Sequence, residues 1–85
     1  MKKFKTDCGY AVYEVTSEEL KQLGGMGICD HCNKPSGVGY LVPVLNRWLC
    51  QGCYAEFNAR AKFYPEDLKA EEFNCRYYES IIPME

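Results

Sequence analysis

The sequence lacks any run of about 18 apolar residues, the length that a membrane-spanning helix requires. Its first residues, MKKFKTDCGY, are basic but have neither the apolar stretch nor the small-residue cleavage site of a signal peptide. We therefore expect a cytoplasmic protein without membrane contact, in a compartment where thiols stay reduced. Internal repeats, low-complexity tracts and long linkers are missing too, so the 85 residues are predicted to form one domain, 1–85.

An excess of basic residues is also missing, because ten Lys and Arg stand against twelve Asp and Glu. Duplex DNA recognition requires clustered positive charge that neutralises phosphates, so the composition disfavours a nucleic-acid partner. The KKFK segment near the start is interpreted as a small solvated basic patch. Histidine occurs once, at His31, between two cysteines. A Ser/His/Asp catalytic set would have to use that residue, and we expect no enzyme.

The chain does contain six cysteines, four of them in two Cys-x-x-Cys pairs that are seventeen residues apart. Two such pairs at this separation are typical of a zinc site, because four soft thiolates can surround one ion as a tetrahedron. A disulfide framework would need a secreted protein. Two further interpretations are iron bound by the same thiolates and a redox role for CQGC at a helix start.

Counting the possible ligands favours a single site. The candidates are Cys8, Cys29, Cys32, His31, Cys50, Cys53 and Cys75. Seven ligands cannot fill two four-ligand sites without a carboxylate. We therefore predict one zinc ion bound by Cys29, Cys32, Cys50 and Cys53. His31 is predicted to be a solvent-facing turn residue, and Cys8 and Cys75 to be small buried hydrophobic residues.

A closed site of four thiolates leaves no position for water or substrate, so it is predicted to be structural. Four thiolates and one zinc dication sum to −2, which would bring the formal charge of the protein from −2 to near −4. Such sites contribute about 10–16 kcal/mol of apparent binding free energy in zinc-finger peptides. A domain of this size has a total stability of about 5 kcal/mol, so the metal is expected to decide whether this region folds.

Sequence patterns predict the following elements. They are a strand over 9–15, a helix over 17–23, a hairpin with strands at 38–42 and through Trp48 and Leu49 around a turn at 45–47, a helix over 51–64 and a helix over 66–80. Thr16 and Glu19 have the spacing of a capping box. Tyr54, Phe57, Ala61 and Tyr64 form one helical stripe, and Phe73, Tyr77 and Ile81 form another. Pro65 is expected to separate the last two helices.

The aromatic residues suggest both a core and a contact surface. Trp48, at a strand end beside the metal, is predicted to lie in the core. Tyr77 and Tyr78 are adjacent, so one should be buried and the other exposed. Twelve aromatic residues exceed what so small a core can enclose. Some of five rings should therefore stay exposed and could anchor a protein partner, unless they pack between the last two helices; the five are Tyr54, Phe63, Tyr64, Phe73 and Tyr78.

The order of a first thiol pair in CDHC, a hairpin, and a second pair in LCQGCYAEF that opens a helix resembles a treble-clef zinc finger. The spacing of the pairs resembles that of GATA-type fingers, and RWLCQGCY is similar to the middle of a LIM repeat. The resemblance covers 29–64. It implies a small α+β zinc-binding domain with a treble-clef-like knuckle, hairpin and helix, flanked by an N-terminal strand and short helix and a C-terminal helix.

A GATA-type finger would be expected to have a basic tail after its helix, whereas this chain has PEDLKAEE. We therefore predict a small zinc-stabilised protein-interaction module or adaptor, whose partner is another protein. The alternative is a GATA-like nucleic-acid-binding finger with a regulatory role.

Overall fold

A computed structural model describes residues 1–84 as a small compact α+β fold around a four-stranded antiparallel sheet. The strands lie in the order β1 (Lys2–Lys5), β2 (Ala11–Thr16), β3 (Val38–Val42) and β4 (Arg47–Leu49). The helices are α1 (Ser17–Lys21), α2 (Gln51–Arg60) and α3 (Leu68–Ile81), and α3 is preceded by a 3-10 turn, η1 (Pro65–Asp67). The sheet is thus a simple meander in which each strand pairs with the next one along the chain.

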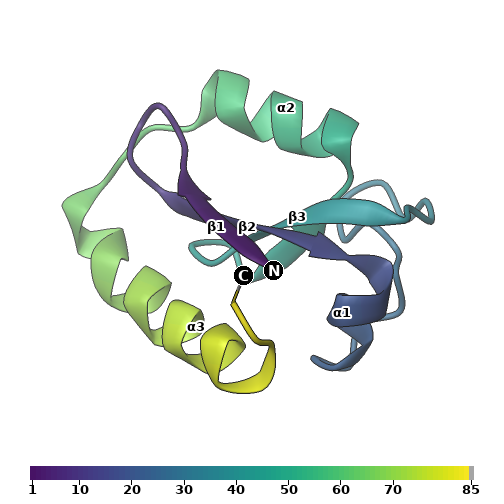
Figure 1. Cartoon of the computed structure of the whole chain (residues 1–85). Helices are drawn as coiled ribbons and strands as arrows, with labels where there is room; N and C mark the ends of the chain where they lie inside the picture. Colours follow the sequence, from purple (N-terminus) through teal and green to yellow (C-terminus); the bar gives the residue numbers. More distant parts are fainter. Residues whose placement is uncertain (85) are drawn as a thin grey trace.

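Helices cover both faces of the sheet (Figure 1). Side chains alternate between the faces along a strand, so Tyr13 and Val15 of β2 pack with α3 and with Leu20 of α1, whereas Val12 packs beneath α2. The larger cluster, on the α3 face, also contains Trp48. The smaller cluster, on the α2 face, contains Cys29, and it is therefore continuous with the four-cysteine group described below.

The first strand, β1, was not predicted. It pairs along its whole length with β2, with Phe4 opposite Val12, and its backbone pairing is what makes the KKFK segment extended. Phe4 also makes edge-on ring contacts with Tyr40 and Tyr54. The three lysines lie along an edge strand, where charged side chains discourage pairing with other chains.

Two predicted elements begin or end elsewhere. The strand predicted over 9–15 starts at Ala11, because Gly9, with a φ of 108°, belongs to the preceding turn. The helix predicted over 17–23 ends at Lys21, and the chain then turns through Gly24, with a φ of 84°. The capping box of Thr16 and Glu19 is confirmed, with the Thr16 hydroxyl accepting from the Glu19 N–H at 3.1 Å.

The predicted extent of α2 was too long. The helix ends at Arg60, and Ala61 is already extended, with a ψ of 137°. The separation of the last two helices is confirmed, since 61–64 are not helical and Pro65 opens η1. This linker is fixed by Tyr10, whose hydroxyl lies 2.7 Å from Asp67 Oδ2 and 2.9 Å from the Lys62 carbonyl oxygen.

Removing that hydroxyl should weaken the linker. Tyr10 is 3 % exposed, and its hydroxyl also accepts from the Tyr64 N–H at 3.2 Å. We expect Tyr10→Phe to lower the free energy of unfolding by about 1–2 kcal/mol, because the linker loses its hydrogen bonds to a buried hydroxyl. Urea denaturation measures the effect, and amide exchange should quicken over 61–67. Tyr64→Phe removes a hydroxyl without a hydrogen bond among residues 1–84 and should change stability little. Equal losses in the two variants would contradict the assignment.

Helix α3 buries a face that differs from the aromatic stripe of the sequence. Tyr78 is 2 % exposed and Tyr77 is 50 % exposed, which confirms that the two adjacent rings differ. Phe73 is 73 % exposed. The inward face is anchored by polar contacts to the β3–β4 turn: Asn74 donates to the Pro43 carbonyl at 2.8 Å, and the Tyr78 hydroxyl donates to Asn46.

The remaining core predictions have mixed outcomes. Trp48 is 1 % exposed, and its indole N–H donates to the Val15 carbonyl at 3.1 Å, so its place in the core is confirmed. Cys75 is buried as predicted. Cys8 is only half-buried, because it lies in the turn before β2, with its sulfur 3.3 Å from the Thr6 hydroxyl. Across residues 1–84, no helix is long and apolar enough to span a membrane.

Candidate metal centre

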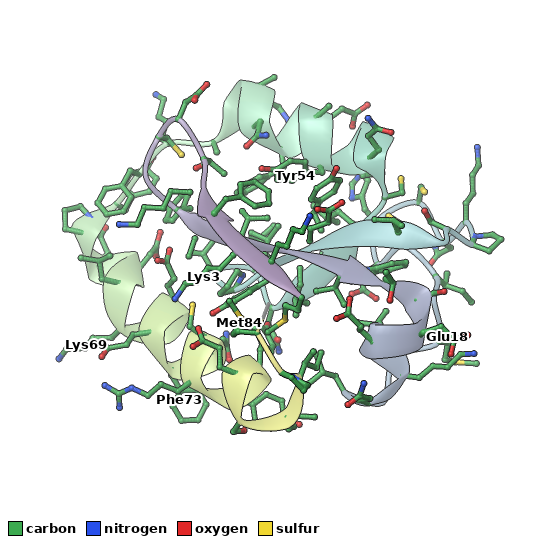
Figure 2. All side chains as sticks on the ribbon, in the orientation of Figure 1. Lys3, Glu18, Tyr54, Lys69, Phe73 and Met84 are labelled. Carbon is green, nitrogen blue, oxygen red and sulfur yellow. The ribbon has the colours of Figure 1, made fainter. Side chains whose placement is uncertain are left out.

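Four cysteine sulfurs meet at one point on the α2 face of the sheet. The Sγ atoms all lie within 4.8 Å of one another, and they belong to Cys29, Cys32, Cys50 and Cys53. The Cys32 and Cys50 sulfurs are 3.8 Å apart. A tetrahedral ion with metal–sulfur bonds of about 2.3 Å requires sulfur separations of about 3.8 Å. The cluster is therefore suitable for one metal ion. The sulfur atoms gather beside the N-terminal end of α2 in Figure 2.

A tight turn positions the first pair. The Cys29 N–H donates to the Lys34 carbonyl at 2.9 Å, and the Asn33 N–H donates to the Cys29 carbonyl at 2.9 Å. Asn33 adopts a φ of 63°, a left-handed conformation that asparagine tolerates better than most residues. Ile28 and Pro35 form a β-bridge that closes the base of this turn. These contacts point both sulfurs of the pair to the same side.

Asp30 ties the turn to the sheet. Its backbone N–H donates to the Trp48 carbonyl at 2.9 Å, and its carboxylate accepts from the Trp48 N–H at 2.8 Å. One residue thereby satisfies both backbone groups on the outer edge of β4 and holds Cys29 and Cys32 beside the second pair. This role could not be predicted from the sequence, because an aspartate inside a Cys-x-x-Cys turn carries no spacing signal of its own.

Helix α2 positions the second pair. Cys50 is the N-cap residue and Cys53 lies in the first turn, so both sulfurs are close to the positive end of the helix dipole. The first turn has neither a side-chain cap hydrogen bond nor an acidic residue. When both cysteines bind a cation as thiolates, they are the negative groups at this helix end, and the dipole favours them there.

The electrostatic environments of Cys29 and Cys53 differ. Burial opposes ionisation of Cys29, but the backbone N–H groups of Cys32, Cys50 and His31 outweigh it and lower the pKa of Cys29 to about 6. The His31 N–H lies 3.4 Å from the Cys29 sulfur. Burial, together with the neighbouring thiols, raises the pKa of Cys53 to about 12. Hydrogen bonds therefore favour a thiolate at Cys29, whereas a thiolate at Cys53 is disfavoured in the absence of a cation.

The other candidate ligands do not join this group. The His31 side chain is exposed, as predicted, and only its backbone serves the site. Cys75 lies in the cluster on the opposite face of the sheet. Within the described chain, 1–84, the four cysteines are the one group of three or more potential ligands that could hold a metal ion.

The site also forms part of the packing beneath α2. Val12, Val42 and Leu49 of the sheet pack with the cysteines, and with Tyr54 and Phe57 of the helix. The Tyr54 ring stacks on that of Tyr40, with centroids 4.3 Å apart, and lies between α2 and the sheet in Figure 2. Helix α2 has no fully buried residue, so its position depends on these two half-buried rings and on the cysteines at its start.

Comparison with known proteins finds no family model, no curated protein and no solved structure that matches this chain.

Proposed function

We propose that the four cysteines bind one structural zinc ion in a treble-clef-like finger. The observation that supports this most is the convergence of all four sulfurs within 4.8 Å of one another, with the Cys32 and Cys50 sulfurs 3.8 Å apart, close to the separation that a tetrahedral ion requires. Thiolate ligands favour zinc over the hard cations that oxygen ligands select. With four protein ligands there is no open position for water, so the ion stabilises the fold and does not act on a substrate.

We expect the purified protein to contain one zinc per chain. The measurement is elemental analysis together with native mass spectrometry, on folded protein that has never met a chelator. The four thiols of the site should react with a thiol reagent only after chelator is added, whereas an iron–thiolate site would be coloured and a redox pair would react at once. Folded protein without metal, or with iron in place of zinc, would refute the proposal.

We further propose that the protein is a small interaction module or adaptor that binds another protein. Its main support is an exposed apolar surface on α3. Phe73 and Tyr77 are four residues apart and therefore adjacent on the helix, and they are 73 % and 50 % exposed. Phe73 projects from α3 away from the sheet in Figure 2. Tyr77 also lines a groove with the exposed side chains of Met26 and Ile28.

The sheet separates these rings from the aromatic residues beneath α2, which are Tyr40, Tyr54 and Phe57. Helices α2 and α3 lie on opposite faces (Figure 1), so they do not enclose Phe73 and Tyr77 between them. Aromatic side chains are enriched at protein–protein interfaces, where they often serve as anchors. The alternative, nucleic-acid binding, draws on Arg47 and Arg60, which line one pocket beside the metal centre. Two arginines on a protein with a net formal charge of −2 provide little phosphate neutralisation.

Phe73→Ser tests the surface on α3. We expect this variant to fold and to retain metal, and to lose at least about tenfold in affinity for a partner captured from the native cells, as an aromatic anchor would. Tyr64→Ser, which removes another exposed ring outside α3, is the matched control. DNA or RNA binding that is tight at low salt and weakens steeply as salt rises would favour the alternative.

A further inference from the structure

A second concave site lies beside the metal centre, on the face of the sheet opposite the exposed rings of α3. It is a pocket of about 320 Å³ between α2 and the β3–β4 hairpin. Leu45, Leu49 and Phe57 give it an apolar lining, and Arg47 and Arg60 add two guanidinium groups from different elements. Its volume is at the small end of the range typical of ligand pockets, about 300–1,000 Å³. A single residue therefore fits it better than a long segment.

The two arginines are available to a ligand. Both are exposed, and within residues 1–84 neither guanidinium makes a hydrogen bond or an ion pair. None of the described residues that line the pocket is acidic. By contrast, Arg76 on α3 pairs with Glu72, and Lys3 pairs with Glu79. The pocket thus joins unpaired positive charge to an apolar lining, on a protein that is acidic overall.

This combination favours a carboxylate attached to an apolar side chain. Arginine binds carboxylates in a fork geometry with two parallel hydrogen bonds, and the leucine and phenylalanine side chains bury an apolar group beside it. A phosphodiester backbone would meet the charge but gain nothing from the apolar lining. Cys53 at one wall is predicted to be a metal thiolate, which would repel an anion, so the carboxylate would lie toward the arginines.

We propose that this pocket binds the C-terminal residue of a partner protein, with the free carboxylate at Arg47 and Arg60 and an apolar side chain against Leu49 and Phe57. A terminal residue supplies both groups within one residue, which suits the size of the pocket. Capture of a terminal carboxylate is a recurring mode of peptide recognition. The proposal rests on the function proposed above only in taking the partner to be a protein.

N-acetyl-leucine is a minimal probe, because it carries one carboxylate and one apolar side chain. Titration into the ¹⁵N-labelled zinc-loaded protein should shift the amide signals of Leu49, Phe57 and Arg60, with a dissociation constant on the order of a few millimolar. N-acetyl-leucinamide, which lacks the charge, and acetate, which lacks the apolar group, should each bind at least about tenfold more weakly. Arg47→Gln and Arg60→Gln should weaken N-acetyl-leucine binding by about tenfold or more.

Arg76→Gln is the control for loss of a surface arginine and should bind as the wild type does. Zinc content and unchanged signals of β2, which contains none of the substituted residues, show that each variant is folded. Three results would overturn the proposal: no shifts in the folded wild-type protein, equal binding of N-acetyl-leucinamide, or equal or tighter binding of inorganic phosphate or a short oligonucleotide at the same residues. Each of these leaves the Phe73→Ser test unaffected, so failure of the pocket and failure of the interaction surface are distinguishable.

Discussion

Cys50→Ser is expected to abolish zinc binding and to unfold the α2 face of the protein. The reason is that serine is a poor zinc ligand, and the three remaining thiolates no longer close the site. Cys50 is also the N-cap residue of α2, so the same change releases the start of the helix. Loss of the metal therefore removes the turn around Cys29, the first turn of α2 and the contacts between them.

The expected free energy of zinc binding is large enough that its loss should unfold the α2 face completely and not merely weaken it. A four-thiolate zinc site contributes about 10–16 kcal/mol of apparent binding free energy in zinc-finger peptides, and a fold of 85 residues has a total stability of about 5 kcal/mol. Helix α2 buries no residue fully, so packing alone does not hold it on the sheet. Burial and the neighbouring thiols also raise the pKa of Cys53, so its thiolate forms less readily once the cation is lost.

Circular dichroism, an ¹H–¹⁵N correlation spectrum and metal analysis give the measurement. Cys8→Ser, in the turn before β2, and Cys75→Ser, in the cluster on the other face, are the controls. Both should keep one zinc per chain. Cys75→Ser should also lose about 1–3 kcal/mol of stability, because it buries a hydroxyl in an apolar cluster. Loss of metal in the Cys8 variant, or retention of metal and fold in Cys50→Ser, would show that the ligands are assigned wrongly.

Local signals explain what the sequence could predict. The two Cys-x-x-Cys pairs, the capping box at Thr16 and Glu19, and the break at Pro65 each depend on residues a few positions apart, and the structure contains the corresponding turn, cap and helix separation. The hairpin of β3 and β4 follows from similar local patterns. These features can be predicted without knowing which segments pack against them.

The features that were missed depend on contacts between distant segments. KKFK is extended because β2 pairs with it. Helix α2 stops at Arg60 because Tyr10 holds the following linker. On α3 the spacing of Phe73, Tyr77 and Ile81 predicted a helix but not its buried face, which depends on the bonds of Asn74 and Tyr78 to the β3–β4 turn. The role of Asp30 likewise depends on a distant segment, because its carboxylate accepts from Trp48 of β4.

Gly39→Ala is expected to lower the free energy of unfolding by about 1–3 kcal/mol, the usual cost of overpacking a core. Glycine inside a strand or helix is ordinarily unfavourable by about 0.5–1 kcal/mol relative to alanine, so the expected sign is the reverse of the usual one. The cause is Trp48. A Cβ added at position 39 would lie 2.4 Å from Cε2 of the indole and 2.8 Å from the Leu49 carbonyl oxygen.

Burial and a hydrogen bond hold the indole ring of Trp48 in place. Trp48 is buried, and its N–H bonds to the Val15 carbonyl, which lies directly across the ladder from Gly39. The ring therefore crosses β3 at the one position where no side chain stands, and it joins β4 to β2. Gly52 in α2 is the matched control, because a Cβ there would meet nothing within 4 Å. Gly52→Ala should stabilise the protein by about 0.5–1 kcal/mol through helix propensity.

A double-mutant cycle with Trp48→Leu isolates the clash. Trp48→Leu alone should cost about 2–5 kcal/mol, as other large-to-small core changes do. Gly39→Ala should then cost less in that background than in the wild type, with a coupling energy of about 0.5–3 kcal/mol. Some cost should remain, because the Leu49 carbonyl is still close. Urea denaturation at saturating zinc provides all four stabilities. Additive effects, or a Gly39→Ala protein as stable as the wild type, would mean that Trp48 does not require the glycine.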